Sequence, residues 1–599
     1  GSGMSLKDLI APFFVWQRAF EKPYTVSLKP IEERPGAPAY RGFHINLSED
    51  CVGCGSCFTI CQNHAIDMVK VDAFEARSGD SGLRPRFDYG RCCWCGLCVD
   101  ICTAGSLRMS NEYAWFTTDP DEFRFVAGME NKSWDGRKGG YHRHPDYHLF
   151  PPKRVAMEML SPQESLDSFN EVVKGYSEAQ AKVEADRCVE CGICVATCPA
   201  HMDVPDYIHS IRDGDYEKGL QLMYRTNPFP ATCGRICTRR CESVCPVGIQ
   251  GEAVAIRWLK RFIVDQVAND DYARILPQAA PATGKHIAIV GAGPGGLSAA
   301  YYLRLKGHAV TVFEAHAQAG GMLRYGVPSY RLPDPALDKD IEHIRAIGVE
   351  MHFNHRVGRD STFAELLDKF DALFVSTGLD VPSNMRIEGE DHPRVMAGLK
   401  LLDDVTEGRD PGIGKQVCVI GGGNVAMDAA RVSRRIGAEV TVLYRRRLED
   451  MPADTEEIHE AQAEGCRFVF QAIPVKAMDA EHSEQVTLQW GEAEMVDDPR
   501  GGRPRPVLQE DRMHLDTFDT IVSAIGQGSN LEFIPADIAE QLEIKWGKFI
   551  PGDYQQMALD KLFVGGDVAN ATADAISAIE DGHHAARGIH RFLDTGQRG

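Results

Sequence analysis

The sequence predicts a multidomain protein that begins with two small cysteine-rich domains, the first α+β and the second α-helical, and ends with two α/β domains. The first observation behind this prediction is that all but two of the 19 cysteines lie before residue 250, in tightly spaced groups. The second is a pair of glycine-rich turns in the C-terminal half, each placed between an apolar, strand-like run and a helical segment. The third is the length of 599 residues, which suffices for about three to five domains.

Composition and charge narrow the classes of function. The apolar fraction of 43% and the charged fraction of 25% are typical of a globular protein in water. A net charge of −21 argues against a surface that binds nucleic acid or an anionic membrane. No apolar run approaches the roughly 20 residues of a transmembrane helix. The cysteine spacing indicates metal clusters rather than disulfide bonds, so we expect a cytoplasmic protein.

Residues 1–40 are predicted to form an N-terminal arm. Within it, residues 5–21 are expected to form a short amphipathic helix that Pro12 breaks, because proline removes a helical hydrogen bond. Two interpretations of the arm stay open. It packs on its own chain, or it docks on another subunit, since exposed apolar termini are often contact surfaces.

Two identical cysteine patterns predict a ferredoxin domain with two [4Fe-4S] clusters over residues 41–112. Each pattern reads Cys-x2-Cys-x2-Cys-x3-Cys, whereas structural zinc, the alternative, usually uses paired CxxC units. In two-cluster ferredoxins the first three cysteines of a run hold one cluster and the fourth holds the other. The predicted ligand sets are Cys51, Cys54, Cys57 and Cys102 for one cluster, and Cys92, Cys95, Cys98 and Cys61 for the other. Cys93 has the wrong offset and is predicted to be a bystander.

Residues 113–165 are predicted to be a surface linker. They are rich in histidine, but the irregular spacing and the lack of an acidic partner disfavour a metal site.

Residues 166–280 are predicted to be a helical domain with two further clusters. Its first cysteine run has the ferredoxin spacing, and its second places a cysteine at every fourth residue, which fits one face of a helix. The candidate ligands are Cys188, Cys191, Cys194, Cys198, Cys233, Cys237, Cys241 and Cys245.

The first glycine-rich turn predicts a dinucleotide-binding domain of the Rossmann type. Residues 287–290 read as a buried parallel strand, and a helical segment follows the turn. Gly291, Gly293 and Gly296 allow a tight turn that brings a pyrophosphate to the helix N-terminus. Glu314 ends the next strand, about 20 residues after the last glycine, and can accept hydrogen bonds from a ribose. An ordinary glycine-rich turn would not require this combination.

The second glycine-rich turn predicts another dinucleotide site, at Gly421, Gly423 and Ala426. Aligned on the first turn, Tyr444 stands where the first domain has its acid, and three arginines follow it. Guanidinium groups at this position suit the 2′-phosphate of NADP, so Arg445 and Arg446 favour NADP over NAD. The alternative, that one or two of the three arginines belong to a solvated charge run, stays open.

Two known families resemble parts of this sequence. The runs AYRGFHINLSEDCVGCGSC and DYGRCCWCGLCVDIC resemble the two-cluster subunit of respiratory complex I over about residues 20–112. The chain departs from ferredoxins at Gln62 and Thr103, where proline is usual after the fourth cysteine. The runs EADRCVECGICVATCPAHMDVPDYI and TNPFPATCGRICTRRCESVCP, with the Rossmann unit, resemble the small subunit of bacterial glutamate synthase over about residues 170–599. Dihydropyrimidine dehydrogenase and NADH-dependent ferredoxin:NADP oxidoreductase contain equivalent modules.

The second resemblance implies an FAD-binding domain over residues 284–405 and 520–599, interrupted by an NAD(P)-binding domain over residues 406–519. It implies that Cys188, Cys191, Cys194 and Cys245 hold one cluster, and that Cys198, Cys237 and Cys241 hold the other. The family often supplies Glu or Gln as the remaining ligand, but Lys260 occupies that position here, so Cys233 is a candidate fourth ligand. Further expected cofactor contacts are Gly321, Arg324, Gly378, Gly526, Gly566 and Asp567.

These parts predict an NAD(P)H:ferredoxin or acceptor oxidoreductase, in which hydride passes to FAD and single electrons pass through four [4Fe-4S] clusters. No catalytic acid or base is expected. The acceptor is ferredoxin or a larger redox subunit, so a hetero-oligomer is expected. The small subunit of an NADPH-dependent glutamate synthase is the alternative, but it leaves residues 1–165 unexplained. A disulfide reductase is disfavoured because Cys418 and Cys466 alone lie beyond residue 250.

Overall fold

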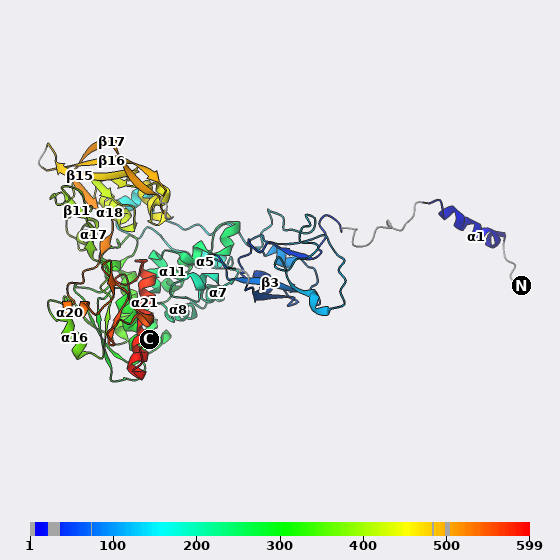
Figure 1. Cartoon of the computed structure of the whole chain (residues 1–599), viewed down its shortest axis with the longest axis horizontal. Coiled ribbons are helices and arrows are strands. Elements are labelled where there is room, and N and C mark those ends of the chain that lie inside the picture. Colours follow the sequence, from blue (N-terminus) through cyan, green and yellow to red (C-terminus); the bar gives the residue numbers. More distant parts are fainter. Residues whose placement is uncertain (1–5, 22–35, 73–74, 482–483, 498–502, 599) are drawn as a thin grey trace. The chain divides into compact units, whose positions relative to one another are not determined.

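The computed structural model describes residues 6–21, 36–72, 75–481, 484–497 and 503–598 (Figure 1). The chain divides into two compact units, Gly1–Leu149 and Phe150–Gly599. Helix α1 (Leu6–Arg18) is continuous through Pro12, so the prediction that Pro12 breaks this helix is wrong. Proline removes a single helical hydrogen bond, and the carbonyl that loses its partner can bond to water where the helix is exposed. Phe13 and Trp16 on this helix are exposed.

The rest of the first unit is a small α+β domain. Its three-stranded antiparallel sheet contains β2 (Ile66–Lys70), β3 (Leu83–Asp88) and β5 (Arg124–Val126). A separate antiparallel pair consists of β1 (His44–Asn46) and β4 (Leu107–Met109). The short helices α2 (Ser56–Ile60) and α3 (Leu97–Asp100) follow the two cysteine-rich loops.

The segment expected to be a linker contributes to the core of this domain. Strand β5 lies within it, and Trp134 is 1% exposed with its ring 4.4 Å from that of Phe43. Trp134 also packs on Phe125, which is fully buried. The domain therefore extends well beyond residue 112. The physical reason is that the aromatic side chains of the segment supply apolar surface that the short strands cannot supply alone.

The helical domain opens the second unit and precedes its two five-stranded parallel sheets. Helix α9 (Pro230–Ile236) packs directly on α11 (Ile256–Gln266), and a Cβ atom on Gly234 would lie 2.8 Å from Arg261 Cα. Glycine is therefore needed for this close approach. The other helices are α4 (Pro162–Leu166), α5 (Glu178–Ala185), α6 (Ile193–Thr197), α7 (Val204–Asp213), α8 (Tyr216–Tyr224), α10 (Arg240–Ser243) and α12 (Tyr272–Ile275).

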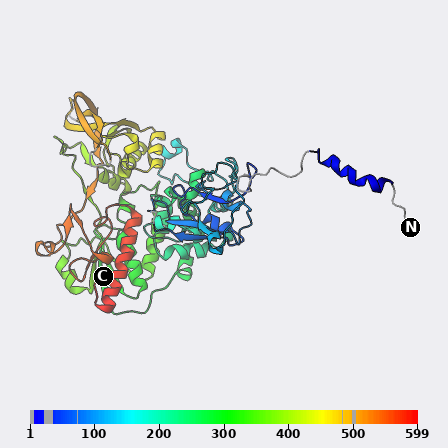
Figure 2. The same cartoon turned by 45° about the vertical axis from the view of Figure 1, so that its right-hand side comes forward.

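The first α/β domain has a five-stranded parallel sheet in the order β22-β9-β6-β7-β8. Helix α13 (Pro294–Leu305) packs against the long C-terminal helix α21 (Ala575–Thr595), which is red in Figure 2. A Cβ atom on Gly582 would lie 2.1 Å from the Gly295 carbonyl oxygen, so the two helices touch through their backbones. The strands are β6 (His286–Val290), β7 (Ala309–Phe313), β8 (Glu350–His352), β9 (Ala372–Val375) and β22 (Leu562–Val564).

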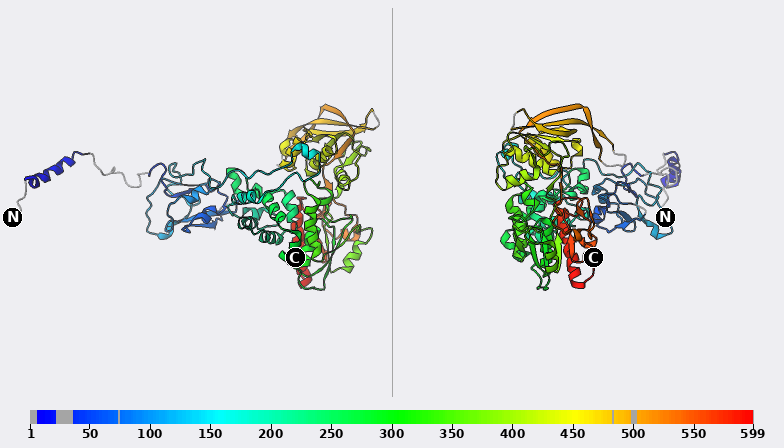
Figure 3. Two further views of the ribbon diagram at one scale, coloured as in Figure 1. Left: turned by 180° about the vertical axis from the view of Figure 1, so that it is seen from behind. Right: turned by 60° about the vertical axis from the view of Figure 1, so that its left-hand side comes forward.

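The second α/β domain has a parallel sheet in the order β11-β18-β12-β13-β14. An antiparallel meander, β15 (Ala472–Asp479), β16 (Val486–Val496) and β17 (Arg505–Phe518), adjoins it (Figure 3). The sheet consists of β11 (Val395–Ala397), β12 (Gln416–Ile420), β13 (Glu439–Tyr444), β14 (Arg467–Phe470) and β18 (Thr520–Ser523). Because β11 and β18 pair inside this sheet, the domain is wider than the expected residues 406–519. An apolar run such as Ile521–Val522 does not reveal which of two similar sheets it joins.

Candidate functional site

A cavity of about 830 Å³ lies where the helical domain and both α/β domains meet. Gly293 and Glu314 of the first α/β domain line it, together with Asn424 of the second. Cys237 and Thr238 of the helical domain form another part of its wall. The cavity therefore brings the first glycine-rich turn, two residues of the second turn (Asn424 and Val425) and Cys237 around a shared volume.

The glycine-rich turn of the first α/β domain leaves the N-terminus of α13 open to a ligand. Gly293 precedes the helix, and no side chain of the described residues caps the helical N–H groups there. The space beside Gly293 that a Cβ atom would fill is empty of described atoms. Gly291 has a φ of +103°, and a Cβ atom on Gly296 would lie 2.0 Å from the Gly291 carbonyl oxygen. These features fit a pyrophosphate at the helix N-terminus.

Glu314 is held as a carboxylate at the end of β7. Its side chain accepts hydrogen bonds of 2.8 Å from the backbone N–H groups of Ala292 and His316, and one of 2.9 Å from the His316 ring. Burial alone would raise the pKa of Glu314, but the bonds from His316 and Ala292 outweigh burial and lower it. The same contact raises the pKa of His316. The carboxylate can therefore accept a hydrogen bond from a hydroxyl group beside the glycine-rich turn.

Asp567 offers a second acidic side chain to the cavity. Its Oδ1 atom is buried without a hydrogen-bond partner among the described residues. Burial raises its pKa to about 6. Buried polar atoms normally have partners, so this oxygen fits a hydroxyl group of a bound ligand. Gly566, which precedes it, has a φ of +76° and also lines the cavity.

The loop before α15 (Asp334–Ala346) contains two residues that were expected to contact the cofactor, Gly321 and Arg324, and only the first lines the cavity. Gly321 lines the cavity, and a Cβ atom there would lie 2.9 Å from Gly293 Cα. Arg324 does not line it, because its guanidinium pairs with Asp334 at 3.3 Å and with Asp338. Its Nε atom also donates to the Ala319 carbonyl at 2.8 Å. The Arg324 side chain therefore ties the loop to α15, and its expected contact with the flavin stays a prediction.

The glycine-rich turn of the second α/β domain has the same geometry as the first. Gly423 precedes α18 (Asn424–Arg435), and no side chain of the described residues caps this helix. Gly421 has a φ of +148°, and a Cβ atom there would lie 2.2 Å from the Ala524 carbonyl oxygen. Ala426 is fully buried. Gly378 lines the cavity, whereas Gly526, with a φ of +131°, precedes the lining residue Gln527.

The three arginines that follow β13 differ in whether their side chains already have partners within the chain. The Tyr444 hydroxyl donates to the Asp450 carbonyl at 2.9 Å. Arg447 pairs with Asp450 at 3.0 Å and with Glu449. Arg446 donates from Nε to a backbone carbonyl, and exposed Arg445 forms no hydrogen bond or ion pair with the described residues. Arg445 and most of the Arg446 guanidinium are therefore available to an anion, while Arg447 is already paired.

The thiols of the first unit affect one another in two groups. Burial raises the pKa of Cys57, and the neighbouring thiols Cys54, Cys98, Cys102 and Cys51 add to this rise. Burial likewise raises the pKa of Cys98, and the neighbours that add to it are Cys92, Cys95 and Cys61. Apart from the influence of Cys98 on Cys57, the thiols that raise each pKa are those that the cysteine spacing assigns to the same cluster.

Single-metal sites and clusters make different demands on their ligands. Over the described ranges, no three His, Cys, Asp or Glu side chains come together as ligands of one metal ion. Each thiolate of a [4Fe-4S] cluster binds a different iron atom, so the four ligands surround a larger volume. In the helical domain Cys188, Cys191, Cys194 and Cys245 line one small pocket, which fits such a set.

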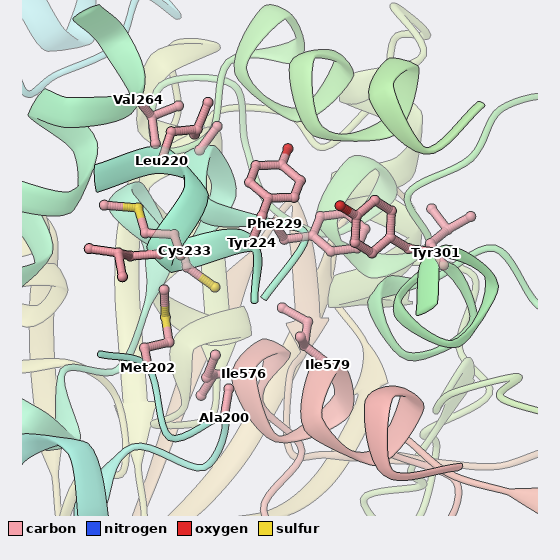
Figure 4. Close-up of a cluster of buried hydrophobic side chains, with 14 of the residues drawn as sticks. Ala200, Met202, Leu220, Tyr224, Phe229, Cys233, Val264, Tyr301, Ile576 and Ile579 are labelled. Carbon is pink, nitrogen blue, oxygen red and sulfur yellow. The ribbon is translucent and has the colours of Figure 1, made fainter. Parts of the chain in front are cut away.

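The remaining thiols of the helical domain surround a buried cation. Lys260 on α11 is 4% exposed. Burial opposes its charge, but the thiols Cys237, Cys233, Cys198 and Cys241 outweigh burial and raise its pKa. Cys233 on α9 is 1% exposed and lies among apolar side chains in Figure 4. Gly234 brings α9 against α11, so Cys233 is the thiol that the structure adds to the three others near Lys260.

The sequence patterns missed Arg331, which lines the cavity, and two arginines that tie the cysteine loop to the α/β domains. Arg331 pairs with Asp428 at 2.7 Å and with Glu457 at 2.8 Å, which joins the two α/β domains at the cavity. Between Cys237 and Cys241, Arg239 pairs with Asp454 and Glu456 of the second α/β domain, and Arg240 pairs with Asp574 of the first. Two adjacent arginines between cysteines were a visible signal, but their acidic partners lie more than 200 positions away in the sequence.

Three segments of the chain match known protein families. Residues 285–586 match the family described as pyridine nucleotide-disulphide oxidoreductase. Residues 165–272 match domain II of dihydropyrimidine dehydrogenase, a 4Fe-4S cluster domain, and residues 50–106 match a 4Fe-4S dicluster domain. None of the helices in the described ranges has the length and apolar character needed to cross a membrane.

Three relatives show the breadth of the match. The NADPH-Fe(3+) oxidoreductase subunit beta of Geobacter sulfurreducens is 35% identical, over 67% of this chain and 64% of its own. The NADP(+)-dependent formate dehydrogenase subunit beta of Moorella thermoacetica is 37% identical, over 67% of this chain and 60% of its own. The chain thus spans less than two thirds of these two relatives. The glutamate synthase [NADPH] small chain of Escherichia coli is 32% identical, over 71% of this chain and 94% of its own. This protein therefore belongs to the pyridine nucleotide-disulphide oxidoreductase family and carries iron–sulfur domains ahead of its dinucleotide-binding domains.

Proposed function

We propose that this chain moves electrons between NADPH and one-electron carriers through FAD and four [4Fe-4S] clusters. The observation that carries the proposal is the cavity itself, since the first glycine-rich turn, Asn424 and Val425 of the second turn, and Cys237 line one volume. Nicotinamide exchanges two electrons as hydride, a cluster carries one at a time, and flavin handles both. A site between a nicotinamide domain and a cysteine group is where a flavin is needed.

Each residue group has a binding role in this proposal. The open N-terminus of α13 holds the FAD pyrophosphate, Glu314 accepts from a ribose hydroxyl, and Asp567 accepts from a ribityl hydroxyl. The open N-terminus of α18 holds the pyrophosphate of NADPH. Arg445 and Arg446 bind its 2′-phosphate. The sixteen cysteines named from the sequence hold the clusters, with Cys233 completing the set beside Lys260.

The acceptor is proposed to be ferredoxin or a larger redox subunit in the cytoplasm. Two of the three relatives are named as beta subunits, which supports a hetero-oligomer. The small chain of glutamate synthase is the second candidate, because the match covers 94% of that relative. The dicluster domain at residues 50–106 favours the first candidate, since an additional electron carrier needs an acceptor of its own.

The test is anaerobic oxidation of NADPH and NADH by the purified chain with a one-electron dye. NADPH is expected to be the better donor. Replacing Arg445 or Arg446 with Ala is expected to raise the KM for NADPH about tenfold or more and to leave that for NADH within about twofold, because each loses a charge-assisted hydrogen bond of about 1.5–3 kcal/mol. Arg447→Ala is the matched control, because Asp450 and Glu449 already hold its guanidinium. Equal loss of both donors would contradict the NADP assignment.

A further inference from the structure

His44 is held on every side within the first unit. It is 1% exposed, and its ring stacks on Phe87 with centroids 4.0 Å apart. Its backbone N–H donates to the Tyr89 hydroxyl at 2.6 Å, and its carbonyl accepts from the Trp134 indole N–H at 3.1 Å. A ring fixed in this way has one orientation, so its two nitrogen atoms face defined partners.

Both ring nitrogens of His44 have a partner. Nε2 lies 3.3 Å from Cys98 Sγ, and Nδ1 lies 3.1 Å from the Tyr89 hydroxyl oxygen. A cysteine that binds iron is a thiolate and can only accept a hydrogen bond. The proton must therefore be on Nε2, and Nδ1 of the neutral ring accepts from the Tyr89 O–H. The Tyr89 oxygen still accepts from the His44 backbone, so every donor in the chain Tyr89–His44–Cys98 meets one acceptor.

We propose that His44 is a positioning residue that donates an Nε2–H···S hydrogen bond to Cys98 and raises the reduction potential of the cluster held by Cys92, Cys95, Cys98 and Cys61. This inference rests on the proposed function, because it requires that the cluster is bound. A hydrogen bond to a ligand sulfur stabilises the reduced cluster more than the oxidised one, since the reduced cluster carries one more negative charge.

The other proposed cluster of the same domain serves as an internal reference. Its ligands have hydroxyl neighbours: Cys54 Sγ lies 3.3 Å from Ser56 Oγ, and Cys102 Sγ lies 3.5 Å from Ser106 Oγ. Within the part of the chain that the structure describes, the His44 ring bonds to Cys98 and Tyr89 and to none of these sulfurs, so a change at His44 should act on one cluster of the pair. The inference therefore predicts a selective shift rather than a general loss of stability.

The experiment is a redox titration of the full-length chain followed by electron paramagnetic resonance. In His44→Leu, we expect the reduced-to-oxidised ratio of the Cys98 cluster at a fixed potential to fall about tenfold, which is about 59 mV for a one-electron couple. Tyr89→Phe, which keeps the ring but removes the hydroxyl, should shift the same cluster in the same direction by less. His144→Leu is the matched control, because His144 is an exposed histidine of the same unit.

A second readout does not depend on the variant folding. With ¹⁵N-labelled histidine, pulsed electron paramagnetic resonance of the reduced wild-type chain should show coupling from one imidazole nitrogen. Absence of that coupling would overturn the inference, as would an unchanged potential in a His44→Leu chain of normal iron content. If the wild-type chain contained no clusters at all, the proposed function would fail instead, so the two failures are distinguishable.

Discussion

Cys233 is the proposed cluster ligand that departs most from the pattern of the resembling family. Lys260 stands where the resembling family often has a ligand, and an ammonium group cannot donate a lone pair to iron. Cys233 is buried on the adjacent helix and influences Lys260 together with the other thiols. We propose that a fourth thiolate, that of Cys233, and the neighbouring cation take the place of the Glu or Gln ligand that the resembling family often supplies.

Iron analysis tests this assignment. The wild-type chain is expected to contain about sixteen iron atoms, four per cluster. Cys233→Ala should lose iron, down to about twelve if the whole cluster is lost, and should alter one cluster signal. Cys93→Ala is the control, since Cys93 is exposed and has no place in either ligand set. A Cys233→Ala chain with unchanged iron and unchanged spectra would show that another group completes the cluster.

Asp567 carries the second prediction at the scale of single residues. Its buried, unpartnered oxygen is expected to bond to FAD, and a hydrogen bond to a charged group contributes about 1.5–3 kcal/mol. Asp567→Ala should therefore weaken FAD binding about tenfold to a hundredfold, which fluorescence titration of the deflavinated chain measures. Asp560→Ala, an exposed acid on the same segment, should bind FAD normally. Equal affinities of the two variants would remove Asp567 from the site.

At the scale of elements, the loop between Cys237 and Cys241 ties three domains together. Arg239 reaches the start of α19 (Thr455–Ala463), where the backbone N–H of Asp454 also donates to Asn424 at the second glycine-rich turn. Arg240 reaches Asp574, which caps α21. The loop that carries two candidate cluster ligands is therefore fixed against both dinucleotide domains.

Thermal unfolding tests the structural part of this description. Arg239→Gln removes charge-assisted contacts of a side chain that is 17% exposed, so we expect a loss of about 1.5–3 kcal/mol and a lower midpoint temperature. Arg274→Gln makes the same change at the exposed Arg274–Glu217 pair, where solvent screens the charges and the midpoint should fall much less. Equal midpoints for the two variants would mean that the Arg239 contacts do not stabilise the folded chain.

The elements also show what the sequence could and could not predict. Both strand–turn–helix units could be predicted because their glycines, strands and helices are local and contiguous. The membership of β18 in the second sheet could not, since parallel pairing is decided by tertiary contacts. Trp134 and β5 were assigned to a linker for the same reason. The ion pairs of Arg324 could not be predicted either, because Asp334 and Asp338 become its neighbours only once the loop folds back on α15.

At the scale of the whole molecule, the protein combines two compact units, and both contain cysteine groups that match 4Fe-4S families. The second unit contains the cavity in which two-electron and one-electron carriers are proposed to meet. The first unit adds a dicluster domain. With the proposed cofactors bound, such a chain would store several electrons at once, and the number stored would depend directly on which cofactors are bound.

An anaerobic reductive titration of the purified chain, followed by optical and electron paramagnetic resonance spectra, tests this central claim most directly. The account predicts uptake of about six electrons per chain, two on FAD and one on each of four clusters. Uptake of about two electrons, with flavin bleaching and no cluster signal, would contradict it.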